Sequence, residues 1–293
     1  MTFKKDDLIQ PLLTVCIVTY NHEAYIKQCL ESVLAQQTSF KYVIHVGEED
    51  GPDGTRDIVE KYTDKYPDKI KLFKWLKKDK ILVNGLSTGR YNFKETLKSA
   101  RSKYVAYCDG DDYWTDPLKL QKQVDFLEAH PDFAMCFHNV DIFDQDKKEV
   151  FSNTSTREVA SATDSMELAK GNYIHAASIV LRNDFTFPEW FNLVYLGDWA
   201  FYMLQVKNRK IKKFHEVMAV YRIHSSGIWA KQNRKLRIRH TVESMEIVLE
   251  HLENSPQVEH ALTQTIRKLR SQLETDQKIG LIQRIKKKLK LLL

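Results

Sequence analysis

Two short acidic segments hold the side chains of this chain that are best suited to bind a cation or a polar ligand. One spans residues 48–53 and the other residues 109–112. Aspartates two positions apart in a loop can both face one divalent cation, and Mg²⁺ or Mn²⁺ held by few protein oxygens keeps open sites for the phosphates of a substrate. The alternative is a pair of solvated loops, but the aromatic residues Tyr113 and Trp114 directly after the second segment favour a site.

Each acidic segment follows a run of apolar residues with the composition of a buried strand. The runs are residues 42–46 and 104–108. In open α/β sheets, ligands bind beyond the carboxyl ends of the strands. The sequence therefore predicts that the two acidic segments meet at one edge of a sheet.

The elements that must position these segments alternate between strands and helices. The pattern predicts strands over 12–18, 42–46, 70–73, 104–108, 134–140, 177–181 and 217–223. It predicts helices over 23–36, 56–65, 92–101, 117–129 and 198–207, with Thr55 capping the second and Asp116 the fourth. This alternation indicates an α/β fold with a mostly parallel sheet. After residue 226 the pattern is helical, with a break near Ser255–Pro256.

Charge is distributed unevenly along the 293 residues. The net charge of +6 divides into −1 for residues 1–225 and +7 for residues 226–293. A nucleic-acid-binding core would carry its own basic face, so we expect no nucleic-acid partner. Four scattered cysteines without a C-x-x-C pair indicate buried thiols in a reducing compartment. With no apolar stretch long enough for a signal peptide or a membrane span, the expected location is cytoplasmic.

Taken in order, the motifs resemble those of glycosyltransferase family 2, the inverting, nucleotide-sugar-dependent enzymes with the GT-A fold. The matching segments are VCIVTYN (15–21), GEEDGPDGT (47–55), DGDDYW (109–114), DPLKLQ (116–121), GDW (197–199) and YRIH (221–224). The resemblance implies a Rossmann-like, mostly parallel sheet flanked by helices. Residues 1–130 would bind the nucleotide-sugar donor, residues 131–228 the acceptor, and residues 229–293 would form a helical basic extension.

The resemblance also implies which residues bind the nucleotide. Tyr20 would stack on the base, and Glu48 or Glu49 would accept a hydrogen bond from a base N–H, which favours uracil and a UDP-sugar donor. The family usually has two aspartates at this place. Arg90, followed by Asn92, would contact the diphosphate; the alternative for Arg90 is a solvated side chain.

Four further residues would surround the divalent cation. Asp109 would touch the ribose or the metal, and Asp111 would be the metal ligand. Asp112 would be a neighbour of this site or, alternatively, would cap the next turn. His224 would reach the metal or the diphosphate, since imidazole suits Mn²⁺; the alternative is a histidine packed in a loop.

Asp198 is the residue we expect to act as general base on the acceptor hydroxyl, because it matches the acidic motif in the acceptor half. The alternative is that it only caps the helix over 199–207. His175 could line the acceptor site, although a packed histidine is the simpler interpretation. His22 is interpreted as a residue at the start of a helix.

These assignments predict a metal-assisted inverting glycosyltransferase of cell-surface polysaccharide synthesis, acting on a hydroxyl of a glycan or of a lipid-linked acceptor. The departure at Glu48 and Glu49 leaves open a catalytically inactive scaffold that binds a nucleotide sugar. Intact Asp109, Asp111 and Asp198 favour the enzyme.

The C-terminal segment 281–293, LIQRIKKKLKLLL, is a basic amphipathic pattern. Plotted at 100° per residue, one arc of such a helix is apolar and carries Leu281, Ile282, Ile285, Leu289, Leu292 and Leu293. The five cations fall outside that arc, at Arg284, Lys286, Lys287, Lys288 and Lys290. The pattern favours an anionic membrane surface at the cytoplasmic face. The alternative is packing against the protein body or a partner chain, and the helix over 240–252 is a further candidate for a homodimer contact.

Overall fold

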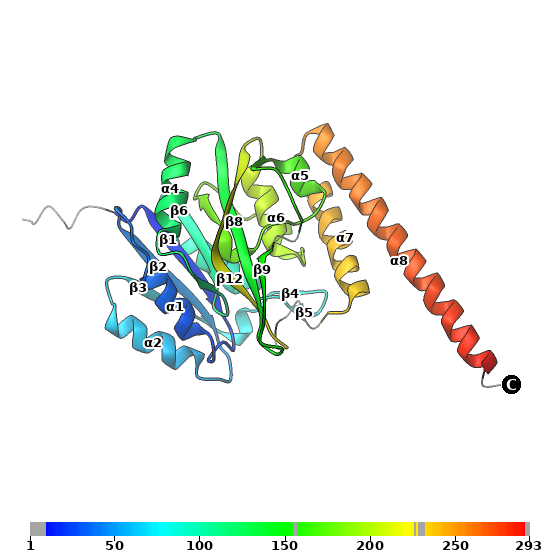
Figure 1. Cartoon of the computed structure of the whole chain (residues 1–293), viewed down its shortest axis with the longest axis horizontal. Helices are drawn as coiled ribbons and strands as arrows, with labels where there is room; N and C mark the ends of the chain where they lie inside the picture. The colour runs from blue at the N-terminus through cyan, green and yellow to red at the C-terminus, as the bar shows by residue number, and fades with distance from the viewer. Residues whose placement is uncertain (1–9, 155–156, 226, 228–231, 291–293) are drawn as a thin grey trace, which may run out of the picture.

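The computed structural model describes residues 10–154, 157–225, 227 and 232–290, and its central feature is a twisted sheet covered by helices (Figure 1). Among these residues, ten strands form one sheet with the main order β10-β12-β8-β11-β6-β1-β2-β3, while β7 pairs with β12 and β9 with β8. The strands are β1 (Leu13–Thr19), β2 (Tyr42–Glu49), β3 (Ile70–Trp75), β6 (Tyr104–Asp109), β7 (Tyr113–Trp114), β8 (Phe133–Asp144), β9 (Glu149–Thr154), β10 (Ala162–Thr163), β11 (Val180–Arg182) and β12 (Lys210–Ile223). A two-stranded hairpin, β4 (Leu82–Val83) and β5 (Leu86–Ser87), stands apart.

The sheet is mostly parallel, as the alternating pattern predicts. β1 pairs in parallel with both β2 and β6, β2 with β3, and β8 with β12. β11 is antiparallel to β6 and to β8 and joins the two parallel parts. Both halves of the chain therefore share one sheet, and the assignment of donor to 1–130 and acceptor to 131–228 stays a prediction.

Helices cover both faces of the sheet and bury a separate apolar core on each. They are α1 (Ile26–Leu34), α2 (Thr55–Lys65), α3 (Arg90–Ser99), α4 (Lys119–Ala129), α5 (Ser165–Ala169), α6 (Gly197–Val206), α7 (Arg234–His251) and α8 (Pro256–Lys290). One core joins α1, α2 and α4 to the sheet through residues such as Leu30, Val59 and Val124. The other joins α3, α6 and α7 through residues such as Leu97 and Trp199. All four cysteines are free and buried, as expected.

Two helix starts differ from the prediction. Thr55 is the first residue of α2 and does not cap it, because its hydroxyl donates to Asp53 Oδ1 at 2.6 Å and accepts from the His22 amide at 2.8 Å. This contact draws the segment after β1 onto the start of α2. Helix α4 begins at Lys119 instead of residue 117; Asp116 Oδ1 accepts from the Leu118 amide one residue earlier. The strand expected over 177–181 is shorter, because a 3₁₀ turn occupies Ala176–Ser178.

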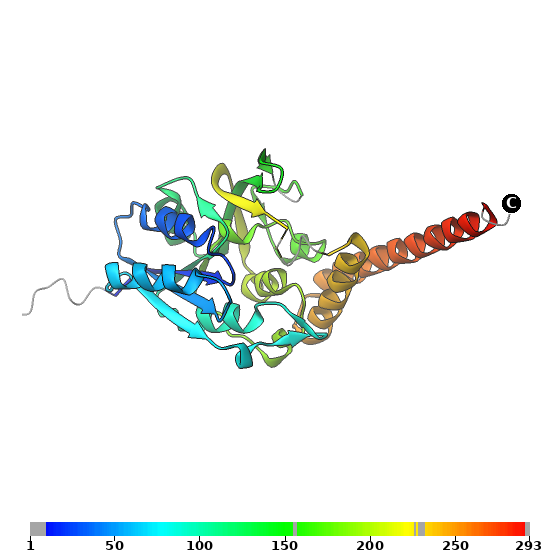
Figure 2. The ribbon, with the colours of Figure 1, turned by 90° about the horizontal axis from the view of Figure 1, so that it is seen from below.

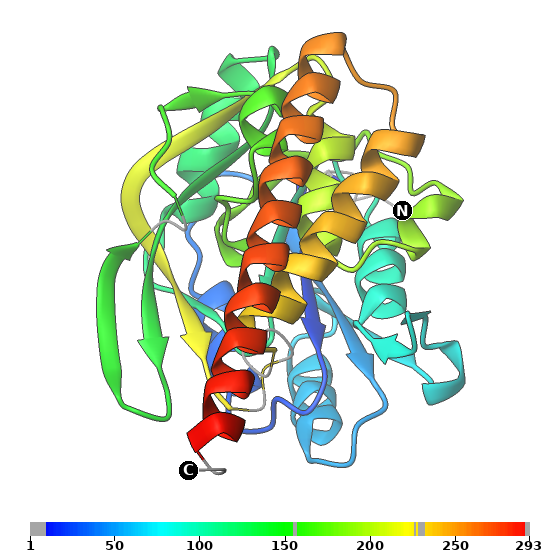
Figure 3. The same cartoon turned by 90° about the vertical axis from the view of Figure 1, so that its right-hand side faces the viewer.

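The C-terminal region is helical with a break where Ser255–Pro256 predicts it. The first turns of α8 lie beside α7 (Figure 3) and bury Val258, Leu262 and Ile266 in the core. Beyond these turns α8 runs away from the body, as Figures 1 and 2 show. The expected amphipathic segment is helical as far as Lys290, while residues 291–293 lie outside the described residues. Across the part of the chain that the structure describes, no helix is both long and apolar enough to cross a membrane.

Candidate active site

The carboxyl ends of β1, β2 and β6 bring the two acidic segments together. In the register of the parallel strands, Thr19 of β1 lies beside Glu48 of β2, and Val18 lies beside Asp109 of β6. The expectation that both segments meet at one edge of the sheet is therefore confirmed. Asn92 on α3 fastens this edge, because its amide donates to the carbonyls of Thr19 at 3.3 Å and Gly47 at 3.0 Å.

Asp111 lies between two imidazoles at this edge. Its Oδ2 is 3.0 Å from Nε2 of His224 and 3.6 Å from Nε2 of His22, and the three candidate ligand atoms lie within 4.8 Å of one another. Burial alone would raise the pKa of Asp111, but the neighbouring histidines outweigh it and lower that pKa. One carboxylate and two imidazoles suit a cation such as Mn²⁺ better than Mg²⁺, which prefers oxygen ligands only.

The ring of His22 faces the site, although only its place at the start of a helix is predicted from the sequence. Its backbone does start a helical turn, because the His22 carbonyl accepts from the amides of Tyr25 and Ile26. Asn21, with a φ of 54°, turns the chain just before it. His22 Nδ1 is buried and has no hydrogen-bond partner among the described residues. A clue in the sequence to the role of His22 is its position just after the strand β1, because residues after the strands of a parallel sheet lie at the ligand-binding edge.

His224 directly follows β12, and this strand places it at a site whose aspartates lie more than 110 positions earlier in the chain. β7, just after the second acidic segment, pairs antiparallel with β12. The Arg222 amide donates to Asp112 Oδ1 at 2.8 Å, and its guanidinium Nε donates to the Asp111 carbonyl at 2.8 Å. These bonds place His224 against the carboxylate of Asp111.

Asp112 lies beside Asp111, and its carboxylate bonds to a distant strand. Its carboxylate is 1% exposed and accepts from a strand far along the chain, so it does not cap the next turn. Burial, together with the charge of Asp111, raises its pKa well above the usual range. Asp112 holds β12 in place, and a direct contact with the nucleotide is a prediction that this geometry does not support.

The expected base-binding residues lie at the end of β2 and just beyond β1. Glu48 is buried and accepts from Arg56 Nε at 2.5 Å; burial raises its pKa although Arg56 opposes the shift. Glu49 Oε1 lies 2.5 Å from Nζ of Lys80, and that ammonium also lies 4.2 Å from the centre of the Tyr20 ring. Lys80 belongs to no motif noted in the sequence, yet it touches two of the expected base-binding side chains.

Asp109 is the last residue of β6, and the pKa of its carboxyl is raised. Its Oδ1 accepts from the Tyr107 hydroxyl at 2.5 Å. Burial and the negative charge of Asp111 raise its pKa to about 7. The two aspartates of the D-x-D pair are therefore not equivalent, and Asp111 is the one that carries a firm negative charge.

Asp198 lies in the first turn of α6. The helix begins at Gly197, so Asp198 is its second residue and does not occupy the N-cap position, and its side chain accepts from Asn172 Nδ2 at 3.0 Å. Burial raises its pKa, although the Trp199 amide and the charge of Arg90 act in the opposite direction. A carboxylate with a raised pKa is a better proton acceptor than an ordinary aspartate.

Arg90 supports the segment that leads into α6. Its side chain is buried, so the alternative of a solvated arginine is wrong, and its Nη2 donates to the carbonyls of Val194 at 2.8 Å and Tyr195 at 3.1 Å. A Cβ at Gly197 would lie 1.3 Å from Arg90 Nη1, so only glycine allows this approach. Contact of Arg90 with the diphosphate stays a prediction that these bonds disfavour.

His175 packs against Tyr221, with ring centres 5.0 Å apart, and burial lowers its pKa to about 4. Its Nε2 has no hydrogen-bond partner among the residues that the structure describes. The packed histidine is confirmed, and contact with an acceptor stays a prediction.

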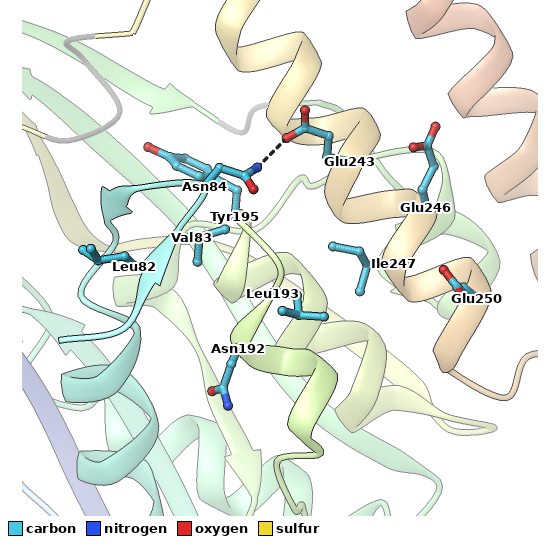
Figure 4. A pocket seen from close by; sticks show the side chains of 10 residues that line it. All are labelled: Leu82, Val83, Asn84, Asn192, Leu193, Tyr195, Glu243, Glu246, Ile247 and Glu250. Carbon is cyan, nitrogen blue, oxygen red and sulfur yellow. Dashed lines mark hydrogen bonds between the residues drawn. The ribbon is translucent and has the colours of Figure 1, made fainter. Parts of the chain in front are cut away.

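A separate pocket of about 420 Å³ lies between the β4–β5 hairpin and α7 (Figure 4). Its wall combines apolar side chains such as Leu193 and Ile247 with three glutamates of α7, Glu243, Glu246 and Glu250. Asn84 of the hairpin donates to Glu243 at 3.1 Å across the pocket mouth. None of the side chains expected in catalysis lines it.

The family model of glycosyl transferase family 2 matches residues 14–186, more than half of the chain, and the chain belongs to this family. An uncharacterized protein of Mycobacterium tuberculosis is 34% identical over 219 residues, which are 74% of this chain and 60% of that protein, so the chain spans well under the full length of this relative. An uncharacterized glycosyltransferase of Nostoc is 28% identical over 73% of this chain and 66% of its own length.

Solved structures establish the fold as GT-A. S. aureus TarS 1–349 in complex with UDP-GlcNAc superposes with a TM-score of 0.61 at 17% identity, covering 87% of this chain and 71% of that one. The mannosyltransferase PcManGT of Pyrobaculum calidifontis, in complex with GDP-Man and Mn²⁺, gives a TM-score of 0.58 at 16% identity, covering 94% and 81%. Identities this low support the fold alone.

Proposed function

We propose that this protein is an inverting glycosyltransferase that moves a sugar from a UDP-sugar to a hydroxyl of a glycan or lipid-linked acceptor in cell-surface polysaccharide synthesis. One observation carries the proposal: Asp111, His22 and His224 converge at the same sheet edge as Glu49 and Tyr20. A nucleotide diphosphate needs a cation for its two phosphates and a binding site for its nucleobase, and these residues are suited to both.

Asp111, His224 and His22 would hold a divalent cation, Mn²⁺ or Mg²⁺. When bound, such a cation neutralises charge on the two phosphates and so makes the nucleotide diphosphate a better leaving group. The low pKa of Asp111 keeps its carboxylate ionised for this role. Asp109, with a pKa of about 7, would contact the ribose or the same cation.

Asp198 would act as general base. Its carboxylate oxygen takes the proton of the acceptor hydroxyl while the hydroxyl oxygen of the acceptor attacks the anomeric carbon from the face opposite the nucleotide. The new glycosidic bond forms as the bond from the anomeric carbon to the phosphate oxygen breaks, and UDP leaves with the electron pair. Asn172 and Arg90 orient Asp198, one by a hydrogen bond and the other through the chain before α6.

The basic segment 281–290 continues α8 away from the body, which supports a peripheral position on an anionic membrane surface at the cytoplasmic face. There the enzyme would meet lipid-linked acceptors. Deleting 281–293 should abolish binding to anionic liposomes in a sedimentation assay and leave turnover of a soluble acceptor unchanged. Unchanged sedimentation would refute the membrane role and leave packing against a partner chain, including a homodimer.

The direct test is release of nucleotide. The full chain is incubated with Mn²⁺ and a panel of UDP-GlcNAc, UDP-glucose, UDP-galactose and GDP-mannose, with and without a glycan acceptor, and free UDP or GDP is measured. Turnover of one UDP-sugar that is lost in Asp198→Asn supports the proposal. Tight binding of UDP without turnover of any donor would identify a nucleotide-sugar-binding scaffold instead.

A further inference from the structure

Three apolar side chains form a row across β12, β8 and β9, strands that lie side by side in Figure 1. Tyr221 of β12 is paired with Ile142 of β8, and Ile142 is paired in turn with Phe151 of β9. Paired residues of neighbouring strands point to the same face of a sheet, so these three side chains share one face. This apolar row spans two strand spacings, about 10 Å.

The inner end of the apolar row lies beside the proposed general base. Asn172 donates to Asp198 Oδ2 at 3.0 Å, and the ring of His175, three residues later, lies 5.0 Å from the ring of Tyr221. Burial raises the pKa of the Tyr221 hydroxyl, and the charges of four aspartates, Asp198 among them, act in the same direction. The row therefore begins close to the place where the acceptor hydroxyl must lie.

The outer end of the apolar row is open to solvent. Phe151 is 46% exposed, whereas Ile142 and Tyr221 are partly buried. Beyond the Tyr221 hydroxyl, the row has no side chain that forms hydrogen bonds. The hydroxyls of a sugar would need such partners, whereas an apolar chain gains free energy by covering Phe151. The composition of the row thus favours an apolar ligand.

The hairpin that carries Phe151 is fixed to the catalytic half of the sheet. Gln145, in the turn between β8 and β9, accepts from Arg222 Nη1 at 2.6 Å, and its amide donates to the carbonyl of Ile223 at 2.8 Å. The next residue, His224, is a candidate cation ligand. Because of these bonds, the position of Phe151 is set relative to the site.

We propose that the apolar row of Tyr221, Ile142 and Phe151 binds the apolar chain of a lipid-linked acceptor, whose sugar presents its hydroxyl to Asp198. The inference rests on the proposed function and selects the lipid-linked acceptor from the two classes named there. Because the row begins beside the base, only a short glycan separates the reacting hydroxyl from the chain. Phe151 is then a determinant of acceptor specificity.

The test compares acceptors that share one sugar and differ in their apolar chain. Methyl and octyl β-glycosides of glucose, galactose and N-acetylglucosamine are given to the full chain with Mn²⁺ and the panel of donors, below the concentration at which the octyl glycosides form micelles. Release of UDP or GDP gives kcat/KM for each acceptor. Burial of the octyl chain should raise kcat/KM at least about tenfold over the methyl glycoside of the same sugar.

Phe151→Ser should reduce this preference for the octyl chain about tenfold, because it removes an aromatic ring that the chain covers. Val150→Ser is the matched control. Val150 is 59% exposed on the same strand, but its pair is Phe143, so it points to the opposite face. The control should keep the preference of the parent chain.

A photolabel gives a second measurement that does not depend on turnover. An octyl glucoside with a diazirine at the end of its chain is irradiated with the full chain in the presence of UDP and Mn²⁺, and mass spectrometry locates the label. The label should lie on the β8–β9 hairpin. Phe151→Ser should reduce this labelling, and Val150→Ser should not.

Equal kcat/KM for methyl and octyl glycosides would overturn the inference, as would an equal loss of preference in the two variants. Labelling confined to other segments would overturn it as well, and it decides the matter if no glycoside of the panel is an acceptor. Release of UDP without any preference for the octyl chain leaves the proposed function standing. Labelling of the hairpin without turnover of any donor would instead overturn the proposed function and leave a site for an apolar chain.

Discussion

Two aspartates at the candidate active site have pKa values that are shifted in opposite directions. Asp111 lies beside His22 and His224, and its pKa is lowered. Asp198 lies beside the neutral amide of Asn172, and its pKa is raised. Burial raises the pKa of both carboxyls, so the difference comes from the neighbours. The two imidazoles outweigh burial at Asp111, whereas the Trp199 amide, the charge of Arg90 and the Asn172 amide do not outweigh it at Asp198.

This difference separates a ligand from a base. A cation ligand must remain ionised whatever the substrate does, and a general base must be able to take up a proton near the working pH. The environments of Asp111 and Asp198 thus assign two roles within one site. Each prediction below tests one side of this contrast.

The largest effect is expected for Asp198→Asn. Loss of the base should lower kcat by about 10²–10⁴-fold while the affinity for UDP stays unchanged. Because the raised pKa means that ionised Asp198 weakens the folded state, this destabilisation grows as pH rises from the unfolded pKa through the folded one. The variant should therefore melt at a higher temperature than the parent at pH 8 and at an equal one near pH 4. A lower melting temperature at pH 8 would contradict the raised pKa.

Asp111→Asn should change the stability of the folded state in the opposite direction. The lowered pKa means that ionised Asp111 stabilises the folded state above its unfolded pKa, and that this contribution is lost as pH falls through the folded pKa. The variant should melt below the parent at pH 7 and converge with it in acid. Its Mn²⁺-dependent affinity for UDP should fall by at least about 100-fold, since even outer partners of metal ligands contribute about 10–100-fold. Unchanged affinity would remove Asp111 from the metal site.

Replacement of the two histidines tests whether the cation site extends beyond the motif residues. His22→Ala and His224→Ala should each weaken Mn²⁺ binding, measured by isothermal titration, by about 10–100-fold. His175→Ala is the matched control, because its ring is packed nearby on Tyr221 and is not part of the group of three. Normal Mn²⁺ affinity in His22→Ala would reduce the site to Asp111 and His224.

The smallest effect on activity is expected for Arg90→Gln, which removes a positive charge near Asp198. Removing the positive charge should raise the pKa of Asp198 further and move the acid limb of the kcat profile to higher pH. Because activity falls as pH drops through that pKa, kcat at pH 7 should fall slightly. Mn²⁺ affinity should not change, since Arg90 bonds to the chain before α6. Weaker binding of UDP to Arg90→Gln would instead support the predicted contact between Arg90 and the diphosphate.

Much of the fold follows from local sequence patterns. The apolar runs before Thr19, Glu48 and Asp109 form the parallel strands that the pattern predicts, and the break at Pro256 separates α7 from α8. These features depend on neighbouring residues, which is why periodicity and turn residues reveal them. The meeting of both acidic segments at one edge also follows, because parallel strands end on the same side of a sheet.

The partners of the site residues do not follow from local patterns. His22 reaches Asp111 only because β1 pairs with β6, and Asp112 bonds to Arg222 only because β7 pairs with β12. Arg90 is buried rather than solvated because α3 packs against the chain before Gly197.

The amino-acid sequence by itself therefore determined which residue types stand at the strand ends, and with them the family and the candidate ligand Asp111. Only the tertiary structure decided which side chains face each other: the imidazoles around Asp111, the amide beside Asp198 and the lysine over Tyr20. The physical reason is range. Strand and helix propensities act over a few residues, whereas the electrostatic environment of a side chain depends on groups that strand register brings in from a hundred positions away.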